Sequence, residues 1–255
     1  MEFGAITRYV DLAQILLYAF WLFFAGLIYY LVREGHREGY PMESDSLGRA
    51  PVNGWPIPSP KTYKLADGSS VTVPELHRPE PRLAAVSTGP SPGSPIEPTG
   101  DPMTSNAGPG AYAMRADKPD LTAHGDVKIV PLRVATDYDV SRNDTDPRGL
   151  PVFGADGKQG GTVREVWLDR SEMLVRYLEV TVPNAAQGPN VLLPIPFARI
   201  RKDRIEVNSL LGHQIAKVPR TRHPDQITFL EEEMVTAYYG AGTLYAEPKR
   251  SEPLI

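Results

Sequence analysis

The chain of 255 residues contains no cysteine. This absence excludes disulfide bonds, thiolate metal ligands and cysteine nucleophiles, and it fits a domain in a reducing compartment. Histidine is scarce as well, with five residues, so imidazole metal sites and nucleophile–base pairs have few candidates. Basic charge is not in excess, because 27 Lys and Arg stand against 31 Asp and Glu, for a formal net charge of −4. A nucleic-acid-binding surface is therefore disfavoured.

Motifs that carry catalysis are missing too. The sequence has no phosphate-binding P-loop, no G-x-S-x-G nucleophile elbow and no H-E-x-x-H pair. The glycine-rich stretch Gly154–Gly161 lies between expected strands and is not followed by a helix, which disfavours a nucleotide site. The pattern predicts a protein that is not an enzyme, and a membrane-anchored hydrolase is improbable without a nucleophile and its base.

One long apolar run is present, at residues 12–32 (LAQILLYAFWLFFAGLIYYLV), with one amide and no charge. As a helix it would span roughly 31 Å, the thickness of a bilayer's hydrocarbon core. A cleaved signal peptide is disfavoured, since the run is too long and no A-x-A-like site follows it. We therefore predict a transmembrane helix over residues 12–32. The run holds no His, Asp or Glu, so it offers no obvious axial ligand for a chlorin or haem, and any membrane cofactor would belong to a partner.

Charges flanking the span predict its orientation. Arg33 and Arg37 follow it, whereas Arg8 alone precedes it closely. By the positive-inside rule, residues 1–11 are periplasmic and the remainder of the chain is cytoplasmic. Arg33 and Arg37 are also placed to bind lipid phosphates, or they act only as stop-transfer charges.

Residues 33–119 form a stretch rich in proline and glycine without sustained periodicity. Lys61–Leu65 and Ser70–Pro74 flank the turn sequence Ala-Asp-Gly-Ser and predict a hairpin. Composition leaves two interpretations open: a disordered linker, or an ordered extended segment laid over another protein. Apolar anchors that a linker would not need favour the second: Trp55, Ile57, Tyr63, Leu65, Met103, Tyr112 and Met114.

Residues 120–255 read as a small β domain. Short apolar segments at close spacing predict an antiparallel barrel or sandwich. The expected strands are Val127–Val134, Leu150–Phe153, Gly161–Asp169, Met173–Val182, Val191–Ile195, Phe197–Ile200 and Arg204–Asn208. Residues 227–240 (ITFLEEEMVTAYYG) predict a helix of two or three turns, followed by a polar tail.

Ordered short motifs run through nearly the whole chain. They are the span ending AGLIYYL, then Arg37–Pro41, Pro98–Pro102, Lys128–Leu132, Gly149–Val152, Tyr177–Val180 and Glu231–Tyr245, with Ala246–Arg250 after it. None is specific alone, but in this order and spacing they resemble the H subunit of the photosynthetic reaction centre of purple bacteria.

The resemblance implies one transmembrane helix and a cytoplasmic domain of the PRC-barrel type. It implies a structural subunit that caps the cytoplasmic face of the L and M subunits in the inner, photosynthetic membrane. Those partners would carry the bacteriochlorophyll, bacteriopheophytin, quinones and non-haem iron, and this chain would bind none alone. A cytochrome subunit and a light-harvesting complex are further expected neighbours. The resemblance also favours residues 33–119 as a segment packed on partners.

The resemblance further implies a role in proton delivery to the secondary quinone. It places Glu179, His124, Asp126 and Lys128 on that route. The pattern alone favours Glu179 as an exposed residue on the solvent-facing side of a barrel, and the resemblance reverses that preference. Partial burial would raise its pKa and suit a proton relay. Family members often carry histidine at both positions 124 and 126, and some an acid at position 122. Asp126 and Thr122 depart from that pattern, which weakens any expectation of a metal there.

A second interpretation assigns the chain to a different functional class. A single-pass anchor could carry an adaptor that docks soluble partners through its β domain. The two differ in whether the chain co-purifies with pigment-bearing subunits after mild detergent extraction.

Overall fold

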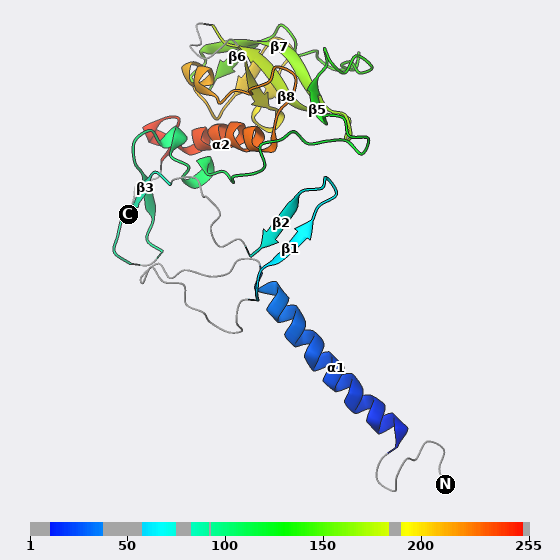
Figure 1. The fold of residues 1–255 in the computed structure, drawn as a ribbon. Coiled ribbons are helices and arrows are strands. Elements are labelled where there is room, and N and C mark those ends of the chain that lie inside the picture. Colours follow the sequence, from blue (N-terminus) through cyan, green and yellow to red (C-terminus); the bar gives the residue numbers. More distant parts are fainter. Residues whose placement is uncertain (1–10, 38–57, 75–82, 92, 184–189, 252–255) are drawn as a thin grey trace. The chain divides into compact units, whose positions relative to one another are not determined.

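The computed structural model describes residues 11–37, 58–74, 83–91, 93–183 and 190–251 (Figure 1). The chain divides into two compact units. The first comprises residues 1–78 with 91–93, and the second comprises residues 79–90 with 94–255. The anchors Trp55 and Ile57 lie outside the described residues.

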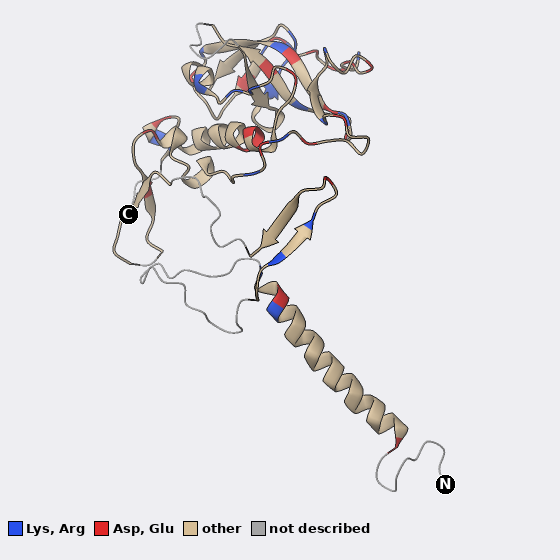
Figure 2. Cartoon of the chain, viewed as in Figure 1, with Lys and Arg blue, Asp and Glu red and all other residues tan. Residues whose placement is uncertain are grey.

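The first unit begins with helix α1, Leu12–Gly35. Asp11 caps it, its carboxylate accepting a hydrogen bond from the Gln14 backbone at 2.7 Å. No residue of α1 is buried in the chain, and the helix is long and apolar enough to cross a membrane (Figure 2). The helix continues three residues past the expected end of the span, through the charged turn at Arg33–Gly35.

A hairpin follows in the same unit, as predicted. Strand β1 (Lys61–Lys64) pairs antiparallel with β2 (Ser70–Val73). Asp67 stabilises the turn by accepting hydrogen bonds from the backbone and hydroxyl of Ser69 at 2.9 and 2.6 Å. Gly68 adopts a φ of +83° there, a conformation that favours glycine.

The second unit begins with a small hairpin and two single 3₁₀ turns. Strands β3 (Ala85–Ser87) and β4 (Ile96–Pro98) pair antiparallel, and the turns are η1 (Pro102–Thr104) and η2 (Gly108–Gly110). Met103 and Ala107 are buried. This part of the proline-rich segment therefore packs against the chain's own C-terminal domain.

The main sheet has seven strands in the order β10-β11-β6-β7-β8-β9, with β5 also pairing β7. The strands are β5 (Ile129–Pro131), β6 (Pro151–Gly154), β7 (Gln159–Asp169), β8 (Leu174–Thr181), β9 (Asn190–Pro194), β10 (Arg199–Ile200) and β11 (Ile205–Val207). The sheet is curled, as Figure 1 shows, so the predicted mainly-β fold is confirmed. The antiparallel prediction needs one correction: β11 pairs parallel to β6, because the chain returns to the sheet's other edge after β9. Three further 3₁₀ helices are η3 (Ile195–Phe197), η4 (Gly212–Lys217) and η5 (Pro248–Arg250).

Helix α2, Phe229–Tyr245, differs from its predicted bounds at both ends. It begins two residues later because Thr228 is its N-cap, with Thr228 and Glu231 forming a reciprocal capping box. It ends five residues later because Gly240 does not terminate it. A Cβ at Gly240 would lie 2.4 Å from the Pro109 carbonyl oxygen, so glycine here permits η2 to pack closely on the helix.

The glycine-rich stretch from the end of β6 to the start of β7 has a packing role. A Cβ on Gly154 would lie 2.2 Å from the Gly212 nitrogen, and one on Gly160 would lie 2.5 Å from the Gly212 oxygen. Asp156 accepts a hydrogen bond from that same Gly212 nitrogen at 2.9 Å. The glycines thus allow the β6–β7 turn to contact η4 backbone to backbone.

The core lies between the curled sheet and α2. Its largest fully buried side chains include Trp167, Leu178, Leu193, Ile205 and Tyr239. Strand β8 is buried on both faces from Tyr177 to Val180, between its neighbours β7 and β9.

Candidate functional site

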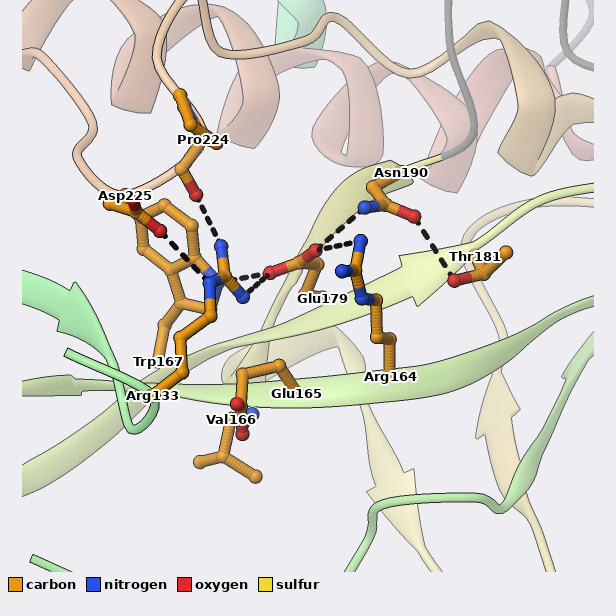
Figure 3. A network of polar contacts seen from close by, with 10 residues as sticks. All are labelled: Arg133, Arg164, Glu165, Val166, Trp167, Glu179, Thr181, Asn190, Pro224 and Asp225. Carbon is orange, nitrogen blue, oxygen red and sulfur yellow. Dashed lines mark hydrogen bonds and ion pairs between the residues drawn. The ribbon is translucent and has the colours of Figure 1, made fainter. Parts of the chain in front are cut away.

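Glu179 lies in the middle of β8 and is only 3% exposed. Its Oε2 accepts hydrogen bonds from Arg133 at 2.6 Å and from the Trp167 indole at 3.0 Å. Its Oε1 accepts one from the Asn190 amide at 2.8 Å, and the Arg164 guanidinium lies 3.5 Å away. The exposed-glutamate alternative is therefore wrong: the carboxylate is the centre of a buried polar network (Figure 3).

A β-bulge on β7 decides which side chains face Glu179. Glu165 is the register partner of Glu179, but the register shifts between Val163 and Glu165. The carboxylate of Glu165 accepts from its neighbour's backbone, Val166, at 3.0 Å, whereas Arg164 and Trp167 contact Glu179 (Figure 3). The bulge places both Arg164 and Glu165 opposite Glu179, and of the two it is Arg164 that forms an ion pair with it.

Arg133 connects this network to a distant loop. Besides Glu179, its guanidinium donates to the Asp225 carboxylate at 2.9 Å and to the Pro224 carbonyl at 2.5 Å. The two carboxylates raise the pKa of Arg133 above its usual value, although partial burial opposes them. Arg133 is a permanent cation that fixes the loop before α2 over the sheet.

A hollow of about 400 Å³ opens beside the network. It is lined by Arg133, Arg164, Trp167, Glu179, Asn190, Val191, Leu192, Arg220, Thr221, Arg222, Pro224 and Asp225. Every described hydrogen bond of Glu179 comes from a donor, so both of its carboxyl oxygens act as acceptors. The arrangement presents a buried carboxyl group at the edge of a polar hollow.

The second group of predicted residues lies in the loop before β5. His124 and Asp126 are exposed, and the backbone nitrogens of both lie near the Thr122 hydroxyl, at 3.3 and 3.2 Å. Gly125, with a φ of +91°, closes the turn between them. Both side chains are therefore accessible to solvent at one tight turn.

Lys128 occupies a different environment, among three carboxylates. Its ammonium lies 3.4 Å from Asp120, 3.3 Å from Asp169 and 3.6 Å from Glu172. Partial burial would lower its pKa, but Asp169 and Asp120 outweigh that effect and raise the pKa above its usual value. Lys128 is thus held as a fixed positive charge.

The two groups do not touch. Asp169, which contacts Lys128, ends β7, while the register partner of Glu179 is Glu165, four residues earlier on that strand. At about 3.3 Å per residue the two places are roughly 13 Å apart along the strand. A proton passing from the His124–Lys128 group to Glu179 would therefore need intervening side chains or water.

Tyr177 and Glu232 form a further polar pair that the sequence did not suggest. The Tyr177 hydroxyl donates to the Glu232 carboxylate on α2 at 2.8 Å. Burial raises the pKa of Glu232 above its usual value, since the ionised form loses hydration. Burial and the neighbouring Glu232 also raise the pKa of Tyr177, so the phenol stays a donor.

In the first unit, the Arg37 guanidinium donates its hydrogen bonds to groups of the chain itself. It is 7% exposed and donates to Glu34 at 2.7 Å and to the carbonyls of Ser59 and Val73 at 2.5 and 3.3 Å. These contacts fasten the end of α1 to the β1–β2 hairpin. Arg33, in the last turn of α1, is half-buried. Lipid binding by either residue stays a prediction.

The resemblance singled out Glu179, but most of the residues that contact it were not predicted. Asn190 follows from the β8–β9 pairing, because it is the register partner of Thr181 at the strand end. Arg133 comes from 46 positions away, and no local pattern signals it. Among the described residues, no cluster of three or more His, Asp or Glu could hold a metal ion.

The chain matches two known families. Residues 4–134, just over half of the chain, match the photosynthetic reaction centre H-chain N-terminal region, and residues 139–214 match the PRC-barrel domain. The apolar α1 and the curled sheet are the structural counterparts of these two matches. The chain therefore belongs to the H-chain family of photosynthetic reaction-centre subunits.

Proposed function

We propose that this chain is a structural, non-catalytic cap on the cytoplasmic face of the L and M subunits, and that it stabilises the secondary quinone site and assists proton delivery to it. Membership of the H-chain family supports the assembly. The observation that carries the proton-delivery role is the buried Glu179 carboxylate, surrounded by donors beside a polar hollow.

The predicted residues have different roles in proton delivery. His124 and Asp126, both exposed, collect protons at the surface. Lys128 acts as a fixed charge among Asp120, Asp169 and Glu172, rather than as a carrier. Glu179 accepts the proton nearest the quinone. Ordered water or partner side chains bridge the roughly 13 Å along β7 between the two groups.

The partner subunits carry bacteriochlorophyll, bacteriopheophytin, the quinones and the non-haem iron, and this chain ligates none of them. A cytochrome subunit and a light-harvesting complex complete the assembly. Residues 1–11 are periplasmic, α1 crosses the photosynthetic membrane, and the β domain is cytoplasmic, with Arg33 and Arg37 near the lipid phosphates.

The test is Glu179→Gln in the assembled complex. The amide keeps the shape of the side chain but cannot hold the transferred proton at neutral pH. We expect the second, proton-coupled electron transfer to slow by about tenfold or more, with primary charge separation unchanged. Flash-induced absorbance changes and proton uptake measured with a pH indicator dye report both steps.

Glu165→Gln is the matched control. Glu165 is the register partner of Glu179, yet its side chain bonds to its own strand. It should leave both steps at wild-type rates. Unaltered proton uptake in the Glu179 variant would remove the relay role, and a colourless preparation would favour the adaptor interpretation instead.

A further inference from the structure

The β10–β11 hairpin carries an excess of positive charge. Residues 199–206 (RIRKDRIE) contain four basic side chains against two acidic ones, whereas the chain as a whole has a net charge of −4. Glu206 is fully engaged, because its Oε2 accepts a hydrogen bond from Arg201 at 3.2 Å and its Oε1 accepts one from Arg204 at 3.1 Å. These two arginines hold the pKa of Glu206 below its usual value, so its carboxylate stays ionised and paired with them.

Arg199 is left without a carboxylate partner. It is the register partner of Glu206 across the hairpin, yet none of the carboxylates that the structure describes lies within ion-pair distance of its guanidinium. Its side chain is exposed and borders a hollow of about 390 Å³. The hollow is lined by Pro196, Phe197, Ala198, Arg199, Glu206, Asn208, Ser209, Thr243 and Arg250. An unpaired guanidinium at such a place attracts an anion.

Ser209, just after β11, adds a donor without an acceptor to the lining of the same hollow. The residue is only 5% exposed, and its hydroxyl makes no hydrogen bond to any described residue. Buried hydroxyl groups are normally hydrogen-bonded, because an unpaired one loses its hydration without compensation. The free hydroxyl therefore points to a ligand that supplies an acceptor atom.

Arg250 fixes the wall of the hollow that carries Ser209. Its Nη1 donates to the carbonyls of Asn208 and Ser209, both at 3.0 Å, and to the carbonyl of Gly242 on α2 at 2.9 Å. Its nearest carboxylate in the described part of the chain, Glu247, lies 3.8 Å away. Arg250 thus joins the segment after β11 to the end of α2 and places a second cation beside the hollow.

The chemistry of the lining matches a phosphate group. A guanidinium binds two oxygens of a phosphate side by side, and the remaining oxygens accept further hydrogen bonds. Arg199 offers the charged donor, while the Ser209 hydroxyl and the Asn208 amide offer neutral ones. Apolar Pro196 and Phe197 line the hollow as well and suit the carbon part of a phosphate ester.

We infer that this hollow binds a phosphate group, which pairs with Arg199 and accepts a hydrogen bond from the Ser209 hydroxyl. Two sources present this chemistry, the headgroup of a phospholipid and free phosphate. The site shares no lining residue with the hollow beside Glu179, so it is independent of the proton-delivery role.

The experiment measures binding of two probes to the full chain in detergent. Isothermal titration calorimetry at constant ionic strength reports the affinity for inorganic phosphate. Native mass spectrometry with added phosphatidylglycerol counts bound lipid, and dioleoylglycerol, which lacks the phosphate, is the comparison lipid. We expect Arg199→Gln and Ser209→Ala each to weaken phosphate-dependent binding by about tenfold, because each removes a donor to a charged acceptor.

Lys202→Gln is the matched control, since Lys202 is an exposed cation of the same hairpin that does not line the hollow. It should keep the wild-type affinity. Tighter binding of phosphatidylglycerol would identify a lipid headgroup as the ligand, and binding of inorganic phosphate alone would identify free phosphate.

The inference is overturned if neither probe binds, or if dioleoylglycerol binds as well as phosphatidylglycerol and phosphate does not bind. Equal losses in Lys202→Gln and Arg199→Gln would also overturn it, because they would show attraction by general positive charge. Arg199 is exposed, so this comparison does not depend on the folding of the Ser209 variant. The relay role is tested separately by the flash measurement with the Glu179 variant.

Discussion

At the scale of single residues, the Tyr177–Glu232 pair couples stability to pH. Because burial raises the pKa of Glu232, the folded chain keeps its proton at pH values where the unfolded chain, with a glutamate pKa of about 4.3, has released it. The stabilisation is complete below that value and is lost as the pH rises through the raised pKa. We expect Glu232→Gln, which stays neutral and still accepts from Tyr177, to flatten this decline.

The measurement is the thermal unfolding midpoint of the full chain in detergent, followed from pH 4 to pH 8. Glu233→Gln is the matched control, since Glu233 is the next residue on α2 and pairs with Arg115 at 3.5 Å near the surface. It should keep the wild-type slope. Equal slopes in the Glu232 variant and the wild type would show that this carboxylate does not set the pH dependence.

Residue-level reasoning could place Glu179 but not its environment. Alternation along β8 puts Glu179 on one face with Tyr177 and Thr181, and the register agrees. It could not show that this face is covered, because the covering loop at Pro224 and Asp225 is tied down by Arg133 from far along the chain. Nor could it foresee the bulge that brings Arg164 to Glu179, since a bulge shifts register without a sequence signal.

At the scale of elements, α2 is the surface on which the proline-rich segment is fixed. A helix interior normally gains about 1 kcal/mol when glycine is replaced by alanine. At Gly240 the added methyl would lie 2.4 Å from the Pro109 carbonyl oxygen. We therefore expect Gly240→Ala to destabilise the chain by about 1–2 kcal/mol and to raise hydrogen exchange at η2.

Thr243→Ala, three residues further along α2 and exposed, serves as the comparison. It should change the free energy of unfolding by no more than about 0.5 kcal/mol and leave η2 protected. Stabilisation by Gly240→Ala would mean that η2 does not rest on the helix as described.

Element boundaries were less predictable than element types. The strand expected over Val127–Val134 shortens to Ile129–Pro131, because the chain turns directly after it, with the backbone nitrogens of Val134 and Ala135 donating to the Pro131 carbonyl. Helix α2 passes the glycine expected to end it, because that glycine serves a contact made by η2. Local patterns predicted what each segment would be, and long-range contacts decided where it stops.

At the scale of the whole molecule, several elements are not covered by other parts of the chain. Helix α1 has no buried residue, and the hairpins β1–β2 and β3–β4 are two-stranded sheets that are mostly exposed. An isolated two-stranded hairpin is marginally stable in water. A bilayer can cover α1, whereas the hairpins need a protein surface, which is what the proposed partners would provide.

Limited proteolysis with subtilisin, a protease of broad specificity, tests this coverage across residues 87–102. In the isolated chain in detergent, the exposed β3–β4 hairpin should open often and be cut rapidly, because cleavage follows the population of locally opened states. In the assembled complex we expect cleavage there to slow by at least tenfold, while the exposed turn at His124–Asp126 serves as the reference site in both samples. Equal rates at residues 87–102 in the two samples would mean that the segment is a free linker, and that what fixes this chain to its partners lies in α1 and the β domain alone.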